Sequence, residues 1–171
     1  IESFDMCDPA AYEHIAWDTF GTIINAAAFT AVDKAESAEG RRAAWNINVE
    51  GVAKLCRVAA EHQLTLVHVS SDYVFDGIQE SHNESEEFAP LGVYGQTKAA
   101  ADALVAQLQR HFIMRSSWVI GDGKNFVRTM MDLSHRVATG KLTQVSVVND
   151  QIGRLTFTKD MAAGILWLLG Y

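Results

Sequence analysis

The side chains with the clearest potential for chemistry are Tyr94 and Lys98, which are spaced to lie on one face of a helix. An ammonium group beside a phenol favours the phenolate, so the pair predicts a Tyr94 pKa below its ordinary value of about 10. A tyrosine with such a pKa can give a proton to a carbonyl oxygen near neutral pH. The same pair is also compatible with an ordinary exposed helix face, because helices produce this spacing often.

A serine, Ser71, could act on the same carbonyl oxygen. It follows the apolar, β-branched segment 64–69, and ligands of open parallel sheets bind beyond the carboxyl ends of the strands. A hydroxyl there could hydrogen-bond to the oxygen that Tyr94 protonates and stabilise its developing charge. The alternative is that Ser70, Ser71 and Asp72 only form a turn through bonds between their side chains and the backbone.

The elements that must position these residues alternate between strand and helix patterns, which predicts βαβ units in one doubly wound α/β domain. The expected strands are 22–25, 64–69, 112–115 and 145–148. The first expected helix is opened by the Asp8 cap and Pro9 and runs towards Asp18, and the last is capped by Thr158 and runs to Leu169. Between them, helices are expected over 38–61 (two helices, or one bent at Gly51), 93–110 and 126–138. Loops are expected over 26–32 and 70–92.

The composition excludes several classes of function. The 171 residues include 14 Lys and Arg against 21 Asp and Glu, and a net charge of −7 argues against non-specific binding to nucleic acid or anionic membranes. Two cysteines are too few for a disulfide framework, and the histidines show no metal-ligand spacing. No apolar run approaches the roughly 20 residues that span a bilayer. We therefore expect a cytoplasmic protein with no metal site and no nucleic-acid or membrane partner.

A glycine-rich turn of the kind that binds a dinucleotide pyrophosphate does not occur before Asn25, where Gly21 is the only glycine. Either the protein binds no dinucleotide, or the sequence lacks the segment that carries this turn. Because the sequence also starts at Ile1 without a methionine, we expect it to be a fragment that by itself is inactive and binds a dinucleotide poorly.

Several motifs in chain order carry a resemblance to a known family. They are NAAAFTAVDKAE (25–36), SSDYVF (70–75), VYGQTK (93–98), RSSWV (115–119) and NDQIG (149–153). The series closely resembles the dTDP-4-dehydrorhamnose reductases, which are extended short-chain dehydrogenases/reductases, over nearly the whole chain. The NAAA and SSDYVF runs are specific to this branch, whereas Tyr-x-x-x-Lys is shared by the superfamily.

The resemblance implies reduction of the 4-keto group of dTDP-6-deoxy-L-lyxo-4-hexulose by NADPH or NADH, which gives dTDP-L-rhamnose. It implies a partial Rossmann-like, doubly wound parallel sheet with helices on both faces. Residues 1–171 would form one NAD(P)-binding domain, with part of the substrate-binding region after about residue 118. A nucleotide sugar would be the small-molecule partner and a second copy of the chain the protein partner. Some family members use Mg²⁺ at a dimer contact, but no motif here carries that over.

The roles implied by the resemblance fall into three groups. The catalytic group has Tyr94 as proton donor, Lys98 to lower its pKa and bind the nicotinamide ribose, and Ser71 to polarise the 4-keto oxygen. The substrate contacts would be Ser71, Asp72 and Trp118. The cofactor contacts would be Ala27, Ala28, Phe29, Thr30 and Asn48, together with Tyr94 and Lys98.

Simpler interpretations stay open for three of these positions. Trp118 could be a core aromatic residue, Asn48 a helix-end cap, and the small residues 26–28 a site of close packing. The sequence also departs from the family pattern at Arg154, where a small residue and a proline usually follow the NDQxG motif.

Two other functions remain as alternatives. A non-catalytic regulatory or binding relative, such as a regulatory subunit of methionine adenosyltransferase, would share the fold. An epimerase or dehydratase of the same superfamily is the other. The intact set of Ser71, Tyr94 and Lys98 favours an enzyme, and the NAAA and SSDYVF runs favour the reductase.

Overall fold

The computed structural model describes residues 4–171. Its contacts divide the chain into two compact units, Ile1–Arg115 and Ser116–Tyr171. The substrate-binding region is expected to begin close to this boundary, after about residue 118.

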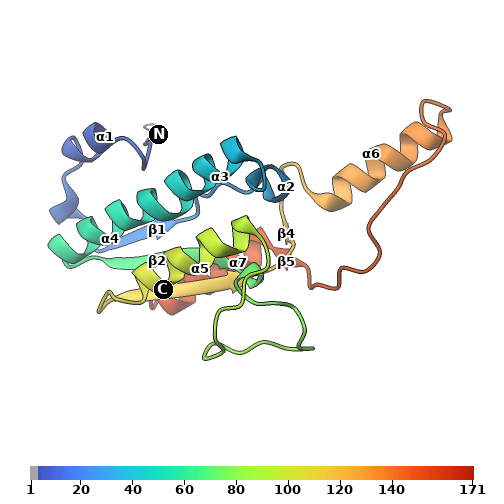
Figure 1. Ribbon diagram of the computed structural model, residues 1–171. Coiled ribbons are helices and arrows are strands. Elements are labelled where there is room, and N and C mark those ends of the chain that lie inside the picture. The colour runs from blue at the N-terminus through green and yellow to red at the C-terminus, as the bar shows by residue number, and fades with distance from the viewer. Residues whose placement is uncertain (1–3) are drawn as a thin grey trace. The chain divides into compact units, whose positions relative to one another are not determined.

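A parallel sheet organises the first unit (Figure 1). Its strands are β1 (Thr22–Asn25), β2 (Thr65–Ser71) and β3 (His111–Ser116), in the spatial order β1-β2-β3. Strands β1 and β2 run parallel, with Thr22 opposite Thr65 and Asn25 opposite His68. The parallel pairing and the helices between the strands confirm the predicted α/β class.

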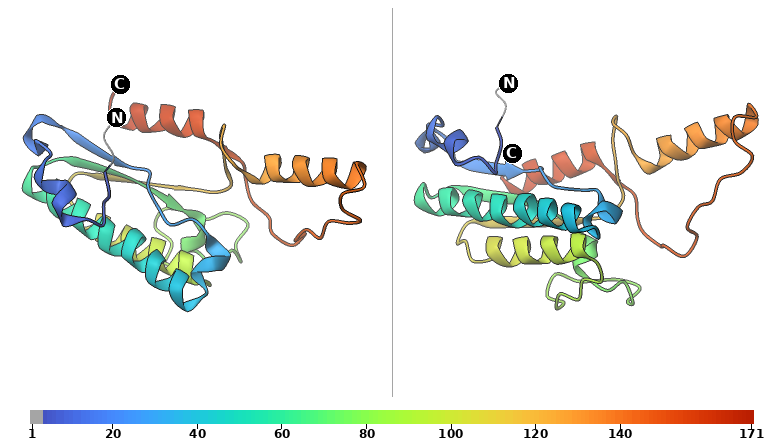
Figure 2. Two further views of the ribbon diagram at one scale, coloured as in Figure 1. Left: turned by 90° about the horizontal axis from the view of Figure 1, so that it is seen from above. Right: turned by 45° about the horizontal axis from the view of Figure 1, so that its top comes forward.

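Helices pack side by side on one face of this sheet (Figures 1 and 2). The helical elements of the first unit are α1 (Pro9–Glu13), η1 (Trp17–Thr19), α2 (Val32–Ala35), α3 (Ala38–Trp45), η2 (Asn46–Gly51), α4 (Val52–Glu61), η3 (Asp72–Val74) and α5 (Val93–Val105). Elements α3, η2 and α4 follow one another without a break, as predicted for residues 38–61, and η2 is a π-helical turn.

Local signals explain how α1 begins and where α5 ends. The Asp8 side chain accepts a hydrogen bond from Ala10 N, so this residue caps α1 as predicted, although the helix is shorter than expected. Helix α5 ends at Val105, before the predicted Arg110, because the chain must turn there to enter β3.

The core of the first unit lies between this face of the sheet and the helices α4 and α5. Its buried residues come from the N-terminal segment, α4, β2 and its approach, and α5: Met6, Val52, Leu55, Val58, Ala59, Leu64, Leu66, Ala101 and Val105. The apolar side chains of α4 recur at helical spacing, so one face of the helix is buried while the other stays in water. This packing fixes α5, which carries Tyr94 and Lys98, against β2, which carries Ser71.

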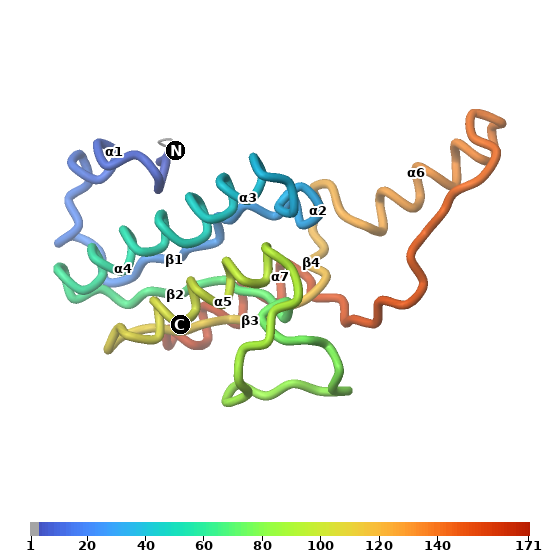
Figure 3. The backbone as a smooth tube through the Cα atoms, in the orientation of Figure 1, coloured from blue at the N-terminus to red at the C-terminus, as the bar shows by residue number. Residues whose placement is uncertain are grey.

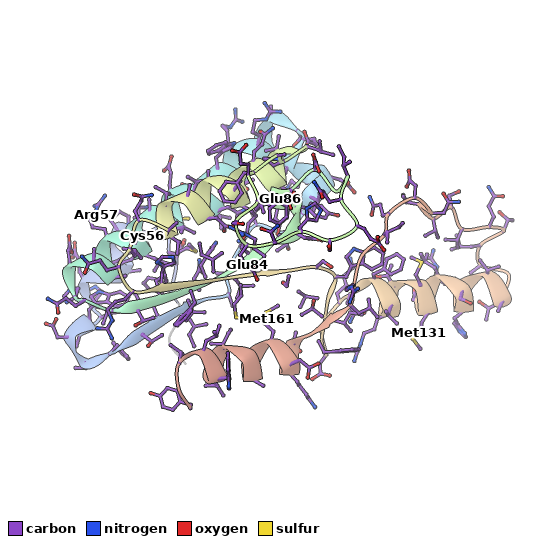
Figure 4. All side chains as sticks on the ribbon, turned by 90° about the horizontal axis from the view of Figure 1, so that it is seen from below. Cys56, Arg57, Glu84, Glu86, Met131 and Met161 are labelled. Atoms are coloured by element: carbon purple, nitrogen blue, oxygen red, sulfur yellow. The ribbon has the colours of Figure 1, made fainter. Side chains whose placement is uncertain are left out.

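A long loop over residues 75–92 leaves the end of η3 and returns to the start of α5 (Figure 3). Glu84 and Glu86 lie on it (Figure 4). The loop is tied back by the Arg115 guanidinium, which lies over the rings of Phe75 and Phe88 and donates a hydrogen bond to the Glu84 carbonyl oxygen. The loop therefore has a fixed anchor on β3 and is held close to the end of β2.

The second unit contains a small parallel sheet of β4 (Val119–Ile120) and β5 (Thr156–Phe157) and the helices α6 (Phe126–Ala138) and α7 (Thr158–Leu168). Helix α6 was predicted with these bounds. Its Phe126, Val127 and Met131 side chains are exposed. Among residues 4–171, no helix combines the length and apolar character needed to cross a membrane.

Two predictions for the second unit are wrong. Residues 145–148 form no strand. The segment that pairs with β4 is β5, at Thr156 and Phe157, so residues 145–148 have no strand partner there. Thr158 does not cap α7: it is the first helical residue, and the cap position is Phe157, with no side-chain hydrogen bond. The Thr158 side chain instead lies against Gly121, where a Cβ atom would come within 2.8 Å of it.

Candidate active site

The candidate site lies at the carboxyl edge of the parallel sheet. Strand β1 ends at Asn25 and β2 ends at Ser71, and because the two strands are parallel these ends share one edge. The side chains of Asn25 and Ser71 are buried, and Tyr94, in the first turn of α5, is partly buried. The structure therefore brings together the ends of strands and helices that were expected to hold the site.

Ser71 and Tyr94 are neighbours in the structure. The Ser71 hydroxyl accepts a hydrogen bond from Tyr73 N at 3.2 Å and donates one to Asp72 Oδ1 at 3.1 Å. It also lies close enough to the Tyr94 phenol to act on its pKa. The turn interpretation and the site interpretation of this segment are thus compatible, because the Ser71 hydroxyl that takes part in the turn is also a neighbour of Tyr94.

Gly95 explains how α5 can approach so closely. A Cβ atom at this position would overlap the backbone carbonyl oxygen of Tyr73 and lie 3.1 Å from the Pro90 side chain. The rings of Tyr73 and Tyr94 then meet edge to face with centroids 5.7 Å apart. No role for Gly95 follows from the sequence, although it lies between Tyr94 and Lys98.

The start of α5 is held by a residue from a distant part of the chain. Glu36 Oε1 accepts a hydrogen bond from Val93 N at 2.8 Å, and Gly92, at the cap position, has no side chain to do so. A carboxylate at a helix N-terminus is favourable because it satisfies a free N–H group and faces the positive end of the helix dipole. Glu36 is the last residue of the 25–36 motif, so this contact explains one structural role of the motif: it holds the start of α5.

The expected lowering of the Tyr94 pKa is not what the structure shows. Burial raises the pKa of Tyr94, the Ser71 hydroxyl opposes that shift, and the Asp72 and Asp102 carboxylates add to it. The reason is that Lys98 turns into the protein: its Nζ donates to the Val69 carbonyl oxygen at 2.8 Å and lies 3.2 Å from His68 Nε2. No hydrogen bond between Lys98 and Tyr94 occurs among residues 4–171.

Lys98 is one of the most deeply buried side chains, with 2% of the residue exposed. Burial lowers its pKa to about 8, and the Asp102 carboxylate opposes that shift. Asp102 is itself fully buried, and its Oδ2 accepts a hydrogen bond from Arg115 Nε at 2.9 Å. Burial raises the pKa of Asp102, whereas Arg115 and Lys98 lower it.

His68 lies next to this charged group. Its Nδ1 is 3.0 Å from Asn25 Nδ2, and its Nε2 is 4.0 Å from Asp102 Oδ1. Burial, and then the charge of Lys98, lower the pKa of His68 to about 3. Neither His68 nor Asp102 is recognisable from the sequence as part of the site, because a histidine in a strand and an acid in a helix have ordinary structural roles.

His68 makes stability depend on pH in a defined window. Its folded pKa lies below the ordinary value of 6.5, so between pH 3 and 6.5 the unfolded chain binds a proton that the folded chain does not. The contribution of His68 to the free energy of unfolding should therefore be fully present above pH 6.5 and be lost as the pH falls towards 3. We expect His68 to contribute a loss of about 2 kcal/mol between pH 7 and pH 5.

This expectation can be measured by urea unfolding of the full-length protein and a His68→Gln variant at both pH values. The remaining histidines are common to both proteins, so their effect cancels in the comparison. The wild type should lose more stability than the variant on acidification. Equal losses would show that His68 takes up a proton in the folded protein.

Asn48 ties the loop after β1 to helix α5. Its Oδ1 accepts from Phe29 N at 2.7 Å, and its Nδ2 donates to the Phe29 carbonyl oxygen at 3.2 Å and to Thr97 Oγ1 at 2.9 Å. Thr97 in turn donates to the Tyr94 carbonyl oxygen at 2.7 Å. Asn48 lies within the π-helical turn η2, so the interpretation as a helix-end cap is wrong.

Replacing Asn48 with Ala should destabilise the full-length protein by about 2–3 kcal/mol, because it leaves partly buried backbone groups of Phe29 and the buried Thr97 hydroxyl without this partner. Asn46→Ala is the matched control, since Asn46 starts the same turn but its side chain is exposed. Chemical unfolding of both variants measures the difference. A loss in Asn48→Ala no larger than that in Asn46→Ala would contradict the assigned role.

The loop that was expected to pass the cofactor lies at this edge of the sheet. Ala27 N donates to Asn25 Oδ1 at 3.1 Å, and Asn48 holds Phe29. Ala27 and Thr30 are exposed, and Ala28 and Phe29 are partly buried. The small side chains therefore leave the backbone of the loop open at its surface, rather than packed inside the protein.

Trp118 belongs to the second unit and joins two of the motifs. It has a positive φ of 45°, which is unusual for a residue with a side chain. Its ring lies 5.6 Å from that of Phe126, and a Cβ atom at Gly153 would come within 2.6 Å of Trp118 Nε1. Ser117 Oγ donates to the Arg154 carbonyl oxygen at 2.8 Å, so the 115–119 and 149–153 motifs meet here.

Asp72 follows Ser71 directly, and its carboxylate is half-buried in η3. Burial raises the pKa of Asp72, and the Ser71 hydroxyl opposes the shift. Among the described residues, no group of three or more His, Cys, Asp or Glu side chains could hold a metal ion.

Comparison with known proteins decides the family. Residues 1–170 match the family described as the RmlD substrate binding domain. The chain belongs to this family. The resemblance seen in the motifs is thereby confirmed. The family match covers residues 1–170, and so also the segments between the motifs.

Named relatives agree with this assignment. A dTDP-4-dehydrorhamnose reductase from Aggregatibacter actinomycetemcomitans is 41% identical over 84% of this chain and 48% of its own length. One from Mycobacterium tuberculosis is 39% identical over 96% of this chain and 54% of its own length. The chain thus spans about half the length of these relatives.

A solved structure shares the fold. It is that of dTDP-4-dehydrorhamnose reductase from Bacillus anthracis in complex with NADP, with a TM-score of 0.85 and 33% identity. The match covers 97% of this chain and 58% of that chain. This structural similarity supports the α/β fold described above for this chain.

Proposed function

We propose that this chain provides the reducing site of a dTDP-4-dehydrorhamnose reductase. The reaction is the NAD(P)H-dependent reduction of the 4-keto group of dTDP-6-deoxy-L-lyxo-4-hexulose to dTDP-L-rhamnose. Residues 1–171 would act as a partial Rossmann-like, NAD(P)-binding domain, with part of the substrate-binding region after about residue 118. Membership of the RmlD substrate binding domain family and the names of the relatives support this proposal.

The observation that carries the proposal is the juxtaposition of Ser71 and Tyr94 at the carboxyl edge of the sheet. Their hydroxyls come from different elements, β2 and α5. The close approach of Gly95 to the Tyr73 carbonyl oxygen and the contact between the Tyr73 and Tyr94 rings, with centroids 5.7 Å apart, hold α5 against the turn that follows Ser71. Two hydroxyls so placed can meet one carbonyl oxygen. A purely regulatory relative would have no need of this arrangement.

Reduction places negative charge on the C4 oxygen, and the chain's own residues would meet that charge. Tyr94 would donate its proton to the oxygen, and the Ser71 hydroxyl would hydrogen-bond to it. Burial keeps the Tyr94 phenol protonated at neutral pH, as a proton donor requires. Lys98 would then have to carry its charge towards Tyr94 to make the phenol a stronger acid.

The described residues fit the nicotinamide end of a dinucleotide. The open backbone of the loop at Ala27, Ala28, Phe29 and Thr30 would hold it, with Asn48 fixing the loop. The buried amine of Lys98 would have to turn out of its inward position to bind it as well. When bound, NADPH or NADH would supply the hydride that reaches C4. A second copy of the chain remains the proposed protein partner, and Asp72 and Trp118 the further substrate contacts.

The direct test is to incubate the full-length protein with the 4-keto sugar nucleotide and either NADPH or NADH and follow cofactor oxidation. We expect oxidation that depends on the keto sugar, with dTDP-L-rhamnose as product. dTDP-glucose, which has no 4-keto group, is the control and should cause none. Sugar-nucleotide binding without oxidation of either cofactor would contradict the proposal and favour a binding protein.

A further inference from the structure

His68 lies between an amide and an amine, deep beneath the candidate site. Its Nδ1 is 3.0 Å from Asn25 Nδ2, and its Nε2 is 3.2 Å from Lys98 Nζ. The residue has no exposed surface, and Lys98 and Asn25 are buried as well. Each ring nitrogen must therefore find its hydrogen-bond partner within this group of side chains.

The orientation of the Asn25 amide is fixed by the loop that follows β1. Its Oδ1 accepts a hydrogen bond from Ala27 N at 3.1 Å, so the amide turns its NH₂ group towards His68. An NH₂ group only donates hydrogen bonds, and His68 Nδ1 must then accept. In a neutral imidazole with Nδ1 as acceptor, the single ring proton is on Nε2.

A proton on Nε2 has a consequence for Lys98. Nε2–H is a donor, and an ammonium group offers donors only, so the two groups would oppose each other at 3.2 Å. A neutral amine resolves the conflict, because it can accept from Nε2–H through its lone pair. It still donates to the Val69 carbonyl oxygen, which lies 2.8 Å away.

We propose that His68 is a positioning residue for Lys98: its Nε2–H tautomer, set by Asn25, favours the neutral amine of Lys98 and keeps that amine turned away from Tyr94. This inference rests on the proposed function, because it concerns how Lys98 is prepared for its role in that reaction. No motif marks His68 for such a role. Its partners Asn25 and Lys98 come from elements far apart in sequence, β1 and α5.

Charging Lys98 then requires a rearrangement that reaches the loop after β1. The amine takes the Nε2 proton, and Nδ1 takes up one proton from water, so that His68 stays neutral in the other tautomer. The Asn25 amide must turn to present its oxygen to Nδ1–H and thereby release Ala27 N–H. A bound ligand that accepts a hydrogen bond from Ala27 N–H would favour the Lys98 ammonium, by the reciprocity of linked equilibria.

The surroundings of His68 and Lys98 have opposing effects on the charge of Lys98. Asp102 on α5 faces both His68 and Lys98, and its Oδ1 has no hydrogen-bond partner among residues 4–171. Arg115 on β3 pairs with Oδ2 of the same carboxylate. Asp102 favours the Lys98 ammonium, whereas burial favours the amine and lowers the Lys98 pKa to about 8. The balance between the two states therefore falls within an accessible pH range.

The proposal can be tested on the wild type by the ¹⁵N shifts of the His68 ring in the full-length, uniformly ¹⁵N-labelled protein. The His68 signals are identified by their loss in His68→Gln. Between pH 6 and 10 we expect the Nδ1–H tautomer at the acid end and the Nε2–H tautomer at the alkaline end, with a midpoint near the Lys98 pKa of about 8. A single tautomer throughout, or a charged ring at pH 6, would overturn the proposal.

Two variants sharpen the test. Lys98→Met removes the titrating amine, so His68 should keep the Nε2–H tautomer between pH 6 and 10. Asn25→Asp presents an acceptor to Nδ1, so His68 should keep a proton on Nδ1 over the same range. A tautomer change that persisted in either folded variant would refute the relay, and if a variant fails to fold, the wild-type titration decides. These spectra do not depend on ketone reduction, so failure of the proposed activity would be recognised separately.

Discussion

Replacing Tyr94 with Phe is expected to lower the kcat of the full-length protein by about 10²–10³-fold, with little change in KM. The variant keeps the ring, which packs against Tyr73, and removes only the hydroxyl that would give its proton to the C4 oxygen. Steady-state oxidation of NADPH or NADH with the 4-keto sugar nucleotide measures the effect.

The matched control for this variant is Tyr171→Phe. Tyr171 is 89% exposed and belongs to no part of the site, so loss of its hydroxyl should leave kcat unchanged. A fall in kcat common to both variants would point to a general effect on the protein. Full activity of Tyr94→Phe would remove Tyr94 as the proton donor.

A methyl group at Gly95 is expected to cost both stability and activity. Alanine is favoured over glycine within a helix by about 1 kcal/mol. The added Cβ would overlap the Tyr73 carbonyl oxygen, however, and backbone atoms cannot turn aside as a flexible side chain can. Because such overpacking costs about 1–3 kcal/mol or more, we expect Gly95→Ala to be destabilised on balance.

The larger effect of Gly95→Ala should be on catalysis. To relieve the overlap, α5 must move away from the turn that holds Ser71, and Tyr94 moves with it. A displacement of about 1 Å in a catalytic group can cost about 10²-fold in rate. Gly21→Ala is the control, because a Cβ atom there meets nothing within 4 Å. If both variants retained wild-type stability and kcat, the close approach at Gly95 would not matter.

The parts of the fold that were predicted from sequence depend on local patterns. The segment that became β2 has a run of apolar and β-branched residues, and α6 has apolar residues at helical spacing, so each could be recognised alone. The short strands β4 and β5 could not, because each exists only through pairing with the other. Residues 145–148 carry a strand pattern but have no such partner, and propensity alone did not make them a strand.

The candidate site was predictable as a set of residues but not as a network. Sequence order placed Ser71 at the end of a strand and Tyr94 on the following helix. It could not show that Lys98 turns inward to Val69 and His68, because that choice depends on buried acceptors from another strand. The prediction of a lowered Tyr94 pKa assumed that helical spacing brings the two charges together, and rotamers decide that instead.

In the proposed reaction, Ser71 and Tyr94 act on one and the same oxygen atom. A double-mutant cycle in single-turnover reduction tests it most directly, with wild type, Ser71→Ala, Tyr94→Phe and the double variant of the full-length protein. We expect each single variant to be slow and the double variant to lose less than the product of the single losses, because the two donors share an acceptor. Single losses that multiply without coupling, or a Ser71→Ala variant as fast as wild type, would contradict it.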